Sequence, residues 1–375
     1  MKILGIIFLI NIFPINMYYC QKRINIIGKD SKDKYIKTLG LITKLQDTYY
    51  SKSTIYDTVR LKNKEFKFKV TPFLDNFPRP FYFVLEIEKN KSYFYTKTFF
   101  ISKDTRKIKF DSDTREILSK SKFELEDRKF DNLFKNIYNE RRKLDSIIYF
   151  TNLKNNFNKN IKLEDSLKLD YQKIDSLENN NLINLSKIHS KSIILFWKLV
   201  ERTEATGYNS IYSEIFKNFD PFIKNSKPGK IYKKNLEILK STSIGQILDI
   251  KIYTNDINKF VYNNKYTLID FWFSYCQPCI EQFPKYKEIY NTHHSKKFEI
   301  VGISTDRKQD KDNWLKVIKN KELNWQQFLD EDGVEAKKLN INKFPTNFLL
   351  DSEGKIIKKD ISPEELEKFL EENLK

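Results

Sequence analysis

Hydrophobic and polar residues alternate in the first third of the chain. Across residues 64–70 the side chains of Phe66, Phe68 and Val70 fall on one face and lysines on the other, and this period of two predicts a half-buried strand. After the Pro-Arg-Pro break at 78–80, further aromatic strands are predicted at residues 81–87, 92–101 and 107–110. We therefore expect a β-rich, sandwich-like domain over residues 21–113.

The period becomes helical from Arg115 onward. One apolar stripe repeats every three or four residues and should face a core; it consists of Phe130, Leu133, Phe134 and Ile137. Further helices are predicted at residues 188–200 and 210–219, a turn at 226–229, and loops at the Asn-rich stretches 155–160 and 179–181. This pattern predicts a helical linker domain over residues 114–243.

Short apolar strands alternate with helices in the last third. Residues 266–273 form a continuous apolar run typical of a buried strand, and residues 280–290 continue as a helix that contains Pro284. Further strands are predicted at 298–304 and 347–351, followed by a turn at 352–355 into Ile356 and Ile357. Alternation of this kind indicates an α/β domain over residues 244–375.

Two cysteines lie between the first strand and helix of this α/β domain, in the order Cys276-Gln277-Pro278-Cys279. A thiolate at a helix start meets unpaired N–H groups and the positive end of the helix dipole, so Cys276 is the expected nucleophile. Cys279, one turn later, could resolve a mixed disulfide. Pro278 suits a first helical turn and stiffens the loop.

Residues 244–375 resemble the thioredoxin-fold domain of TlpA/ResA-like thiol-disulfide oxidoreductases. The resemblance rests on the cysteine motif together with Asp270, Trp272, Pro284 and Pro345. It implies that Asp270 is a buried acid beside the resolving cysteine and takes its proton. It also implies that Pro345 is a cis-proline that positions the incoming substrate strand. Residues 306–341 resemble the helix and strand that this branch inserts before the cis-proline.

Two positions depart from the family pattern. Tyr275 replaces the usual tryptophan before the first cysteine, and Ile280 replaces a common basic residue after the second. Without that cation the Cys276 thiolate is less stabilised, and the reduction potential stays open between roughly −270 and −120 mV.

Six residues around the cysteines are candidate substrate contacts. They are Trp272, Tyr275, Gln277, Pro278, Phe344 and Thr346. For Trp272 and Phe344, packing in the core is the favoured interpretation over a chemical role.

The polar motifs also have explanations that involve no redox chemistry. The cysteine pair could be a structural disulfide or half of a zinc site, but zinc needs four ligands and there is no second Cys-x-x-Cys. His293 and His294 adjoin a helix end and do not predict a metal site. Asp270 could be an ordinary strand-end residue. We expect no metal and no cofactor besides a redox-active Cys276–Cys279 disulfide.

The charge balance adds little about partners. The chain of 375 residues has 68 Lys and Arg against 50 Asp and Glu, a formal net charge of +18. A basic protein can bind nucleic acid or an anionic surface. However, Lys, Asn and Ile are abundant throughout and Gly is scarce, as low-GC coding bias produces, and no phosphate loop or compact basic motif occurs. No nucleic-acid partner is predicted.

The N-terminus predicts export to the periplasm or cell envelope. Lys2 precedes an apolar segment at residues 3–15, and residues 1–20 read as a signal peptide. Lipid modification of Cys20, ordinary cleavage after it, and an uncleaved membrane anchor all stay open. The chain has three cysteines, so removal of Cys20 would leave only the redox pair.

The leading hypothesis is a secreted protein-disulfide reductase. Its partners would be disulfide-containing envelope proteins such as apocytochromes c, with a membrane thiol reductase as electron donor. Net oxidation would use the same residues. In a second hypothesis the β-rich and helical domains bind a protein, peptide or glycan, and the thioredoxin-like part is subordinate. Peroxide reduction is disfavoured because the lone peroxidatic cysteine context is missing.

Overall fold

The computed structural model describes most of the chain from Ile24 onward. The described residues are 24–30, 36–43, 55–60, 64–70, 77–87, 93–102, 105, 107–118, 121–154, 161–252, 257–341 and 343–374. The predictions for residues 1–20, for Cys20 and for the loop at 155–160 lie outside them. The chain divides into two compact units, one of residues 1–42 and 55–119 and the other of residues 43–54 and 120–375.

The first unit is β-rich. Its strands are β1 (Ile24–Asp30), β2 (Ile36–Thr43), β3 (Ile55–Arg60), β4 (Glu65–Val70), β5 (Arg79–Ile87), β6 (Tyr93–Tyr95), β7 (Phe99–Ile101) and β8 (Lys107–Phe110). One sheet has the order β4-β1-β8, and the other has the order β3-β2-β5-β6 with β7 also paired to β5. Phe66 and Phe68 of the first sheet contact Phe83 of the second, so the aromatic core lies between the sheets as the alternating pattern predicted.

The single strand predicted at 92–101 is wrong, because the chain forms β6 and β7 with a break between them. The Thr96 hydroxyl accepts a hydrogen bond from the Phe83 N–H at 2.9 Å. This side-chain contact takes up a donor on β5 that a continuous strand would have paired, and β7 pairs with an earlier part of β5.

From residue 121 onward, the described part of the second unit begins with six helices. They are α1 (Lys122–Lys154), α2 (Ile161–Ile188), α3 (Ile193–Thr206), α4 (Ser210–Asn218), α5 (Pro221–Asn225) and α6 (Lys227–Ser241). Phe196 of α3 is buried and packs against Phe216, Phe219 and Tyr232 from the elements that follow it. The helical period after Arg115 was therefore interpreted correctly.

Two details of the apolar stripe and the loops were wrong. Phe130 and Phe134 are buried, whereas Leu133 is 57% exposed, so the buried stripe is narrower than predicted. Residues 179–181 are not a loop but lie within α2. Asn179 is buried there, and its Oδ1 is 3.5 Å from Nε of Arg202, so a tertiary contact overrides its preference for turns.

The helix boundaries also differ from the prediction. The helix predicted at 188–200 is split, since α2 ends at Ile188 and Ser192 caps α3 by accepting the Leu195 N–H at 3.0 Å. The turn predicted at 226–229 is the start of α6. Ser226 is its N-cap and Pro228 lies in its first turn, where a proline costs no helical hydrogen bond.

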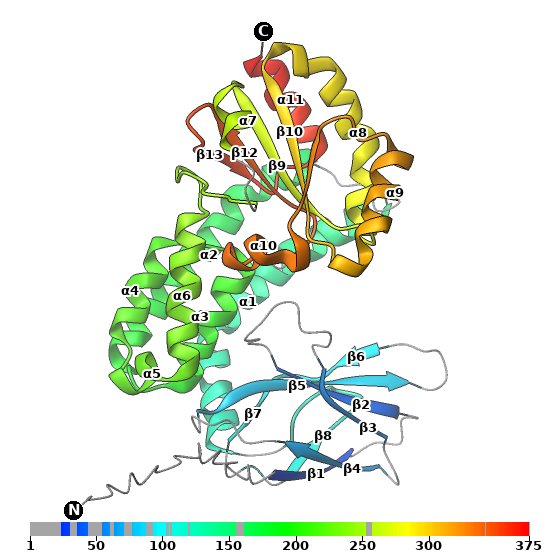
Figure 1. Cartoon of the computed structure of the whole chain (residues 1–375). Helices are drawn as coiled ribbons and strands as arrows, with labels where there is room; N and C mark the ends of the chain where they lie inside the picture. Colours follow the sequence, from blue (N-terminus) through cyan, green and yellow to red (C-terminus); the bar gives the residue numbers. More distant parts are fainter. Residues whose placement is uncertain are drawn as a thin grey trace, which may run out of the picture. The chain divides into compact units, whose positions relative to one another are not determined.

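The rest of the second unit is an α/β domain (Figure 1). Its elements are α7 (Asn258–Tyr262), β9 (Tyr266–Trp272), α8 (Gln277–His293), β10 (Phe298–Ser304), α9 (Lys311–Lys321), β11 (Gln326–Leu329), α10 (Val334–Lys338), β12 (Thr346–Asp351), β13 (Ile356–Lys359) and α11 (Pro363–Asn373). The sheet order is β11-β10-β9-β12-β13. Strands β9, β10 and β11 are parallel, and β12 is antiparallel to β9 and β13. This is the predicted thioredoxin fold.

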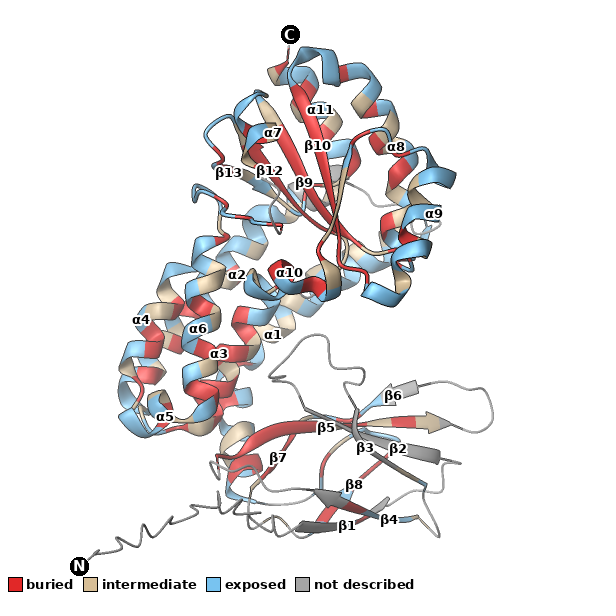
Figure 2. Cartoon of the chain, viewed as in Figure 1, coloured by how far each residue is buried: buried red, intermediate tan, exposed pale blue. Residues whose placement is uncertain are grey.

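Helices cover both faces of this sheet. One core cluster joins Leu268 and Trp272 of β9 to residues of α8, α9 and α11, and another joins Ile269 and Phe271 to α7 and α10. The central strands are therefore buried on both sides (Figure 2), which explains the continuous apolar runs. Because alternate residues share a face, Asp270 lies with Leu268 and Trp272 on the side of α8.

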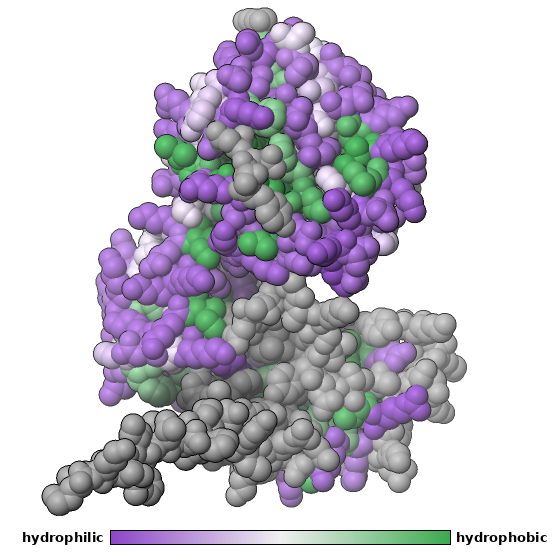
Figure 3. Space-filling view, in the orientation of Figure 1, coloured by the Kyte–Doolittle hydropathy of each residue, from purple (hydrophilic) through white to green (hydrophobic). Residues whose placement is uncertain are grey.

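The outer surface is mostly hydrophilic on the face shown in Figure 3, with hydrophobic residues in small patches among the described atoms. This distribution agrees with the interpretation of the charge as a solvated surface. Within the described part of the chain, no helix combines the length and the apolar character needed to cross a bilayer.

Helices α1, α2 and α3 are joined by a partly buried ionic network. Arg202 of α3 contacts Asp175 at 2.6 Å and Glu178 at 3.1 Å, and Arg141 of α1 contacts the same two carboxylates at 2.7 and 3.0 Å. The Arg202 side chain is only 4% exposed. Each carboxylate of α2 is thus shared by two guanidinium groups, and loss of one partner would leave buried charge incompletely compensated.

Arg202→Met should lower the free energy of unfolding of the second unit by about 3 kcal/mol, because it leaves the buried Glu178 carboxylate with one of its two cationic partners. Urea unfolding followed by far-UV circular dichroism measures the change. Lys173→Met is the matched control: its pair with Asp170 is largely exposed, so the effect should stay below about 1 kcal/mol. Equal effects of the two substitutions would show that the network adds no stability.

Candidate active site

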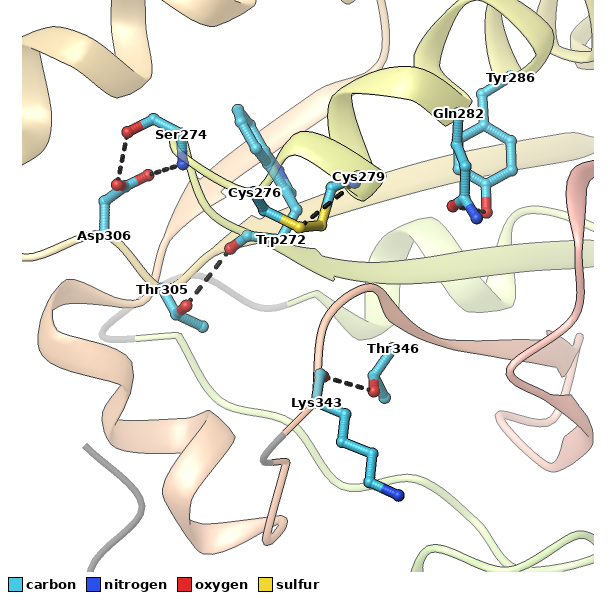
Figure 4. Close-up of a disulfide and its surroundings, with 10 residues drawn as sticks. All are labelled: Trp272, Ser274, Cys276, Cys279, Gln282, Tyr286, Thr305, Asp306, Lys343 and Thr346. Atoms are coloured by element: carbon cyan, nitrogen blue, oxygen red, sulfur yellow. Dashed lines mark hydrogen bonds between the residues drawn. A yellow bond between two sulfur atoms is a disulfide. The ribbon is translucent and has the colours of Figure 1, made fainter. Parts of the chain in front are cut away.

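The cysteine turn joins β9 to α8. Cys276 is the N-cap of α8, its N–H donates to the Phe273 carbonyl at 2.9 Å, and its Sγ accepts from the Cys279 N–H at 3.3 Å. The two cysteines form a disulfide with Cα atoms 5.3 Å apart (Figure 4). Pro278 lies in the first helical turn. Cys276 thus has the helix-start position that favours a thiolate when the disulfide is reduced.

Exposed residues surround the buried disulfide. Cys276 and Cys279 are 3% and 1% exposed, whereas Tyr275, Gln277 and Pro278 are exposed. The Tyr275 side chain is 65% exposed, and the Gln277 amide donates to Glu281 at 3.0 Å. These three residues are therefore accessible to a partner approaching the sulfur atoms.

Asp270 is a buried acid on the central strand. Its register neighbours are Gly302 on β10 and Asn347 on β12. Among the described residues its Oδ1 atom has no hydrogen-bond partner. Burial raises the pKa of Asp270 to about 7, since an ionised carboxylate is poorly solvated there. Burial and the nearby Asp270 charge also hold the pKa of Tyr286 on α8 well above its ordinary value.

The loop before β12 lies beside the cysteine turn. The Phe344–Pro345 peptide bond is cis, as the resemblance implied. The Phe344 ring packs edge-on against Phe273, with ring centroids 5.2 Å apart, and Phe273 accepts the hydrogen bond from Cys276. Thr346 begins β12 opposite Phe271, and its hydroxyl donates to the Lys343 carbonyl at 2.8 Å.

A polar cluster lies on the other side of the cysteine turn (Figure 4). The Asp306 carboxylate accepts hydrogen bonds from the N–H and hydroxyl of Ser274 at 2.9 and 2.7 Å. Ser304 donates its hydroxyl to the same carboxylate at 2.6 Å. The Thr305 N–H donates to the Trp272 carbonyl at 2.9 Å. The end of β10 is therefore bonded to the residues just before Cys276.

Comparison with known proteins identifies relatives of the α/β domain. Residues 263–356 match a family model described as thioredoxin-like. Sporulation thiol-disulfide oxidoreductase A of Bacillus subtilis is 32% identical over 110 residues, which cover 28% of this chain and 67% of the relative. Thiol-disulfide oxidoreductase ResA of Bacillus thuringiensis is 30% identical over 144 residues, covering 38% and 80%. The chain belongs to the ResA-like thiol-disulfide oxidoreductases.

Solved structures include similar domains. The thioredoxin domain of a thiol-disulfide oxidoreductase from Bacteroides vulgatus is 32% identical and has a TM-score of 0.32, with 36% of this chain and 100% of that chain covered. A thiol-disulfide oxidoreductase from Bacteroides fragilis is 37% identical, with a TM-score of 0.27 and coverage of 29% and 82%.

The predicted family and enzyme class are confirmed: this ResA-like chain is a thiol-disulfide oxidoreductase. One predicted substrate contact needs correction. Trp272 is fully buried, its ring packs edge-on against Phe283, and its Nε1 donates to Gln327 at 3.2 Å, so it belongs to the core. Phe344 is half-buried and packs on Phe273. The roles of the remaining site residues stay predictions.

The residues that hold the cysteine turn were not predicted from the sequence. Ser274 and Asp306 lie 32 positions apart, and no local pattern joins them. The polar run Ser304-Thr305-Asp306 at the end of an apolar strand could have indicated this contact. Carboxyl ends of neighbouring parallel strands meet at one sheet edge, so this run had to lie near the end of β9.

Within the described residues, no group of three or more His, Cys, Asp or Glu side chains is arranged to hold a metal ion. The expectation that a redox-active disulfide is the sole cofactor stays a prediction.

The raised pKa of Asp270 makes the stability of this ResA-like chain pH-dependent. Between the ordinary value of 3.8 and about 7, the folded protein keeps a proton that the unfolded chain releases. The contribution of this retained proton to the free energy of unfolding is therefore full below pH 3.8 and is lost as the pH rises to about 7.

Asp270→Asn, uncharged at every pH, should therefore be more stable than the wild type at pH 8 by roughly 4 kcal/mol, and the difference should shrink toward pH 4. Urea unfolding of the oxidised proteins at several pH values checks this, with Asp312→Asn on the exposed side of α9 as control. Parallel stability curves for wild type and Asp270→Asn would contradict the assignment.

Proposed function

We propose that the chain is an exported protein-disulfide reductase that acts through the Cys276-Gln277-Pro278-Cys279 dithiol. The observation that carries the proposal is the Cys276–Cys279 disulfide at the start of α8, on the sheet face that also holds the buried Asp270. A thiolate position, a second thiol and a proton acceptor are the three groups that thiol-disulfide exchange requires.

The reaction begins with the reduced protein. The Cys276 thiolate attacks one sulfur of a substrate disulfide, the substrate S–S bond breaks, and a mixed disulfide forms while the second substrate sulfur leaves as a thiolate and takes a proton from water. The Cys279 thiolate then attacks Cys276 and releases the first substrate sulfur. Two electrons pass to the substrate, and the protein ends with the Cys276–Cys279 disulfide.

Asp270 acts in the second step. Cys279 must lose a proton before it attacks, and a carboxyl group with a pKa of about 7 is poised to accept that proton and to return it later. Its burial excludes water, so the proton would not be lost to the solvent. The Asp270 carboxylate is disfavoured in the resting protein and becomes neutral as Cys279 ionises.

The substrate would approach over the exposed residues of the turn. Tyr275, Gln277 and Pro278 are accessible, and Pro345 with Thr346 offers backbone atoms on the neighbouring loop. Disulfide-containing envelope proteins are the proposed substrates, with a membrane thiol reductase as electron donor. The basic and apolar N-terminal segment of residues 1–20 supports export.

Insulin reduction by the full chain with dithiothreitol tests the dithiol. Cys276→Ser should abolish the activity because it removes the attacking sulfur. Cys279→Ser, reduced beforehand and freed of dithiothreitol, should accumulate a mixed disulfide with insulin because the resolving thiol is missing. Non-reducing electrophoresis detects that adduct. Cys20→Ser is the matched control and should keep full activity. Undiminished reduction by Cys276→Ser would refute the proposed function.

The reduction potential of the Cys276–Cys279 pair tests the direction of electron flow. We expect a value near that of thioredoxin, about −270 mV, for a dedicated reductant. The oxidised fraction across a glutathione or dithiothreitol series gives the value. A result near about −120 mV, the potential of a strong oxidant, would reverse the proposed direction.

A further inference from the structure

Asp306 is a buried acid that the exchange reaction does not use. It follows β10 directly, and its side chain, like those of Ser274 and Ser304, is buried. Its carboxylate accepts three hydrogen bonds, two from Ser274 and one from the Ser304 hydroxyl. Asn313 of α9 contributes a fourth contact to the cluster by donating to the Ser274 hydroxyl at 3.0 Å.

The donors and acceptors of this cluster are fully matched. Ser274 accepts from Asn313, so its hydroxyl proton is directed to Asp306. Ser304 accepts from the Asp306 N–H at 3.1 Å, so its proton is also directed to the carboxylate. The three groups that hydrogen-bond to the Asp306 carboxylate are then all donors, which matches the acceptor capacity of its two oxygens.

The cluster holds the turn that carries Cys276. Ser274 is two residues before Cys276 and is bonded to Asp306 through both its backbone and its side chain. Trp272 lies two residues before Ser274, and its carbonyl accepts a hydrogen bond from the Thr305 N–H. Cys276 itself closes the turn by donating to Phe273. The end of β10 therefore anchors the turn on which Cys276 reaches the N-cap position of α8.

We propose that Asp306 is a positioning residue for the dithiol: by binding Ser274 it keeps Cys276 at the N-cap of α8, where the helix stabilises the thiolate. This inference rests on the proposed role of Cys276 as the attacking sulfur. Within the described part of the chain Asp306 makes no hydrogen bond to either sulfur atom, so it acts through Ser274. Its function is to fix geometry, which matters because small displacements of a reacting group slow exchange strongly.

The sign of the effect separates positioning from simple electrostatics. If Asp306 acted only as a nearby negative charge, neutralising it would lower the thiol pKa of Cys276. If it acts as an anchor, neutralising it releases the turn, Cys276 loses the helix N-terminus, and its pKa rises. The two explanations predict opposite shifts for the same substitution.

Asp306→Asn tests the proposal. The asparagine is isosteric, but its amide presents two N–H donors to groups that are themselves donors. The pKa of Cys276 is measured in the full chain, in a Cys279→Ser background, from the pH dependence of iodoacetamide alkylation of the peptide that contains Cys276. The mass of that peptide keeps Cys20 out of the measurement.

Asp330→Asn is the matched control. Asp330 is also a buried aspartate directly after a strand, and it accepts the N–H groups of Glu335 and Ala336 at 3.0 and 2.9 Å. These contacts hold the start of α10, not the cysteine turn. Both substitutions should destabilise the fold, but only Asp306→Asn should change the thiol.

We expect the Cys276 pKa to rise by about one unit or more in Asp306→Asn, toward the value of about 8.5 for a free cysteine, and to stay unchanged in Asp330→Asn. An unchanged or lowered pKa in Asp306→Asn would overturn the proposal. If Asp306→Asn does not fold, Ser274→Ala decides: it keeps the carboxylate, removes one of the two bonds to the turn, and should produce a smaller rise.

The outcome is separable from that of the proposed function. Insulin reduction by the wild type and by Cys276→Ser tests whether the dithiol is the reacting group. Alkylation compares thiol pKa values between variants and needs no turnover. A chain that reduces insulin through Cys276 but shows no pKa change in Asp306→Asn or Ser274→Ala would refute the anchor alone.

Discussion

The parallel pairing of β9 with β10 is the constraint on which the rest of the α/β domain depends. Seven residue pairs join the strands, from Tyr266 with Phe298 to Trp272 with Ser304, so the two strands end together at one edge. The cysteine turn leaves β9 at that edge, and the Asp306 cluster leaves β10 beside it. This one register thus brings the cysteine turn and the groups that hold it to the same edge of the sheet, although the two segments are far apart in sequence.

Burial of the same sheet on both faces determines the electrostatics of the site. Strand β9 is apolar except at Asp270 and Thr267, and α8 covers the face on which Asp270 lies. A carboxyl group at this place loses its hydration, and its pKa rises to about 7. Asp306, at the edge of the sheet, is also buried but accepts three hydrogen bonds. The two acids therefore differ in their partners and, as we infer, in their tasks: Asp270 handles a proton and Asp306 holds a turn.

Prediction from the sequence was most successful where a single element carries the signal. The apolar run of β9, the Cys276–Cys279 motif and Pro284 follow one another in a short segment, and the resemblance supplied the cis bond at Pro345. It failed where contacts between helices override local preference. Asn179 lies inside α2 beside Arg202, and Leu133 is exposed although it fits the helical stripe, because the width of a buried stripe depends on what packs against it.

The sequence by itself determined the cysteine pair and the succession of β9, α8, β10 and β12, because hydrophobic period and motif spacing are local properties of the chain. The enzyme class came with the family resemblance that these residues carry. Tertiary structure alone decided which distant residues meet. It joined Ser274 to Asp306 and Trp272 to Gln327, and it placed Asp270 in an environment that raises its pKa. Register, burial and hydrogen-bond partners arise only when separate elements pack together, so no local pattern contains them.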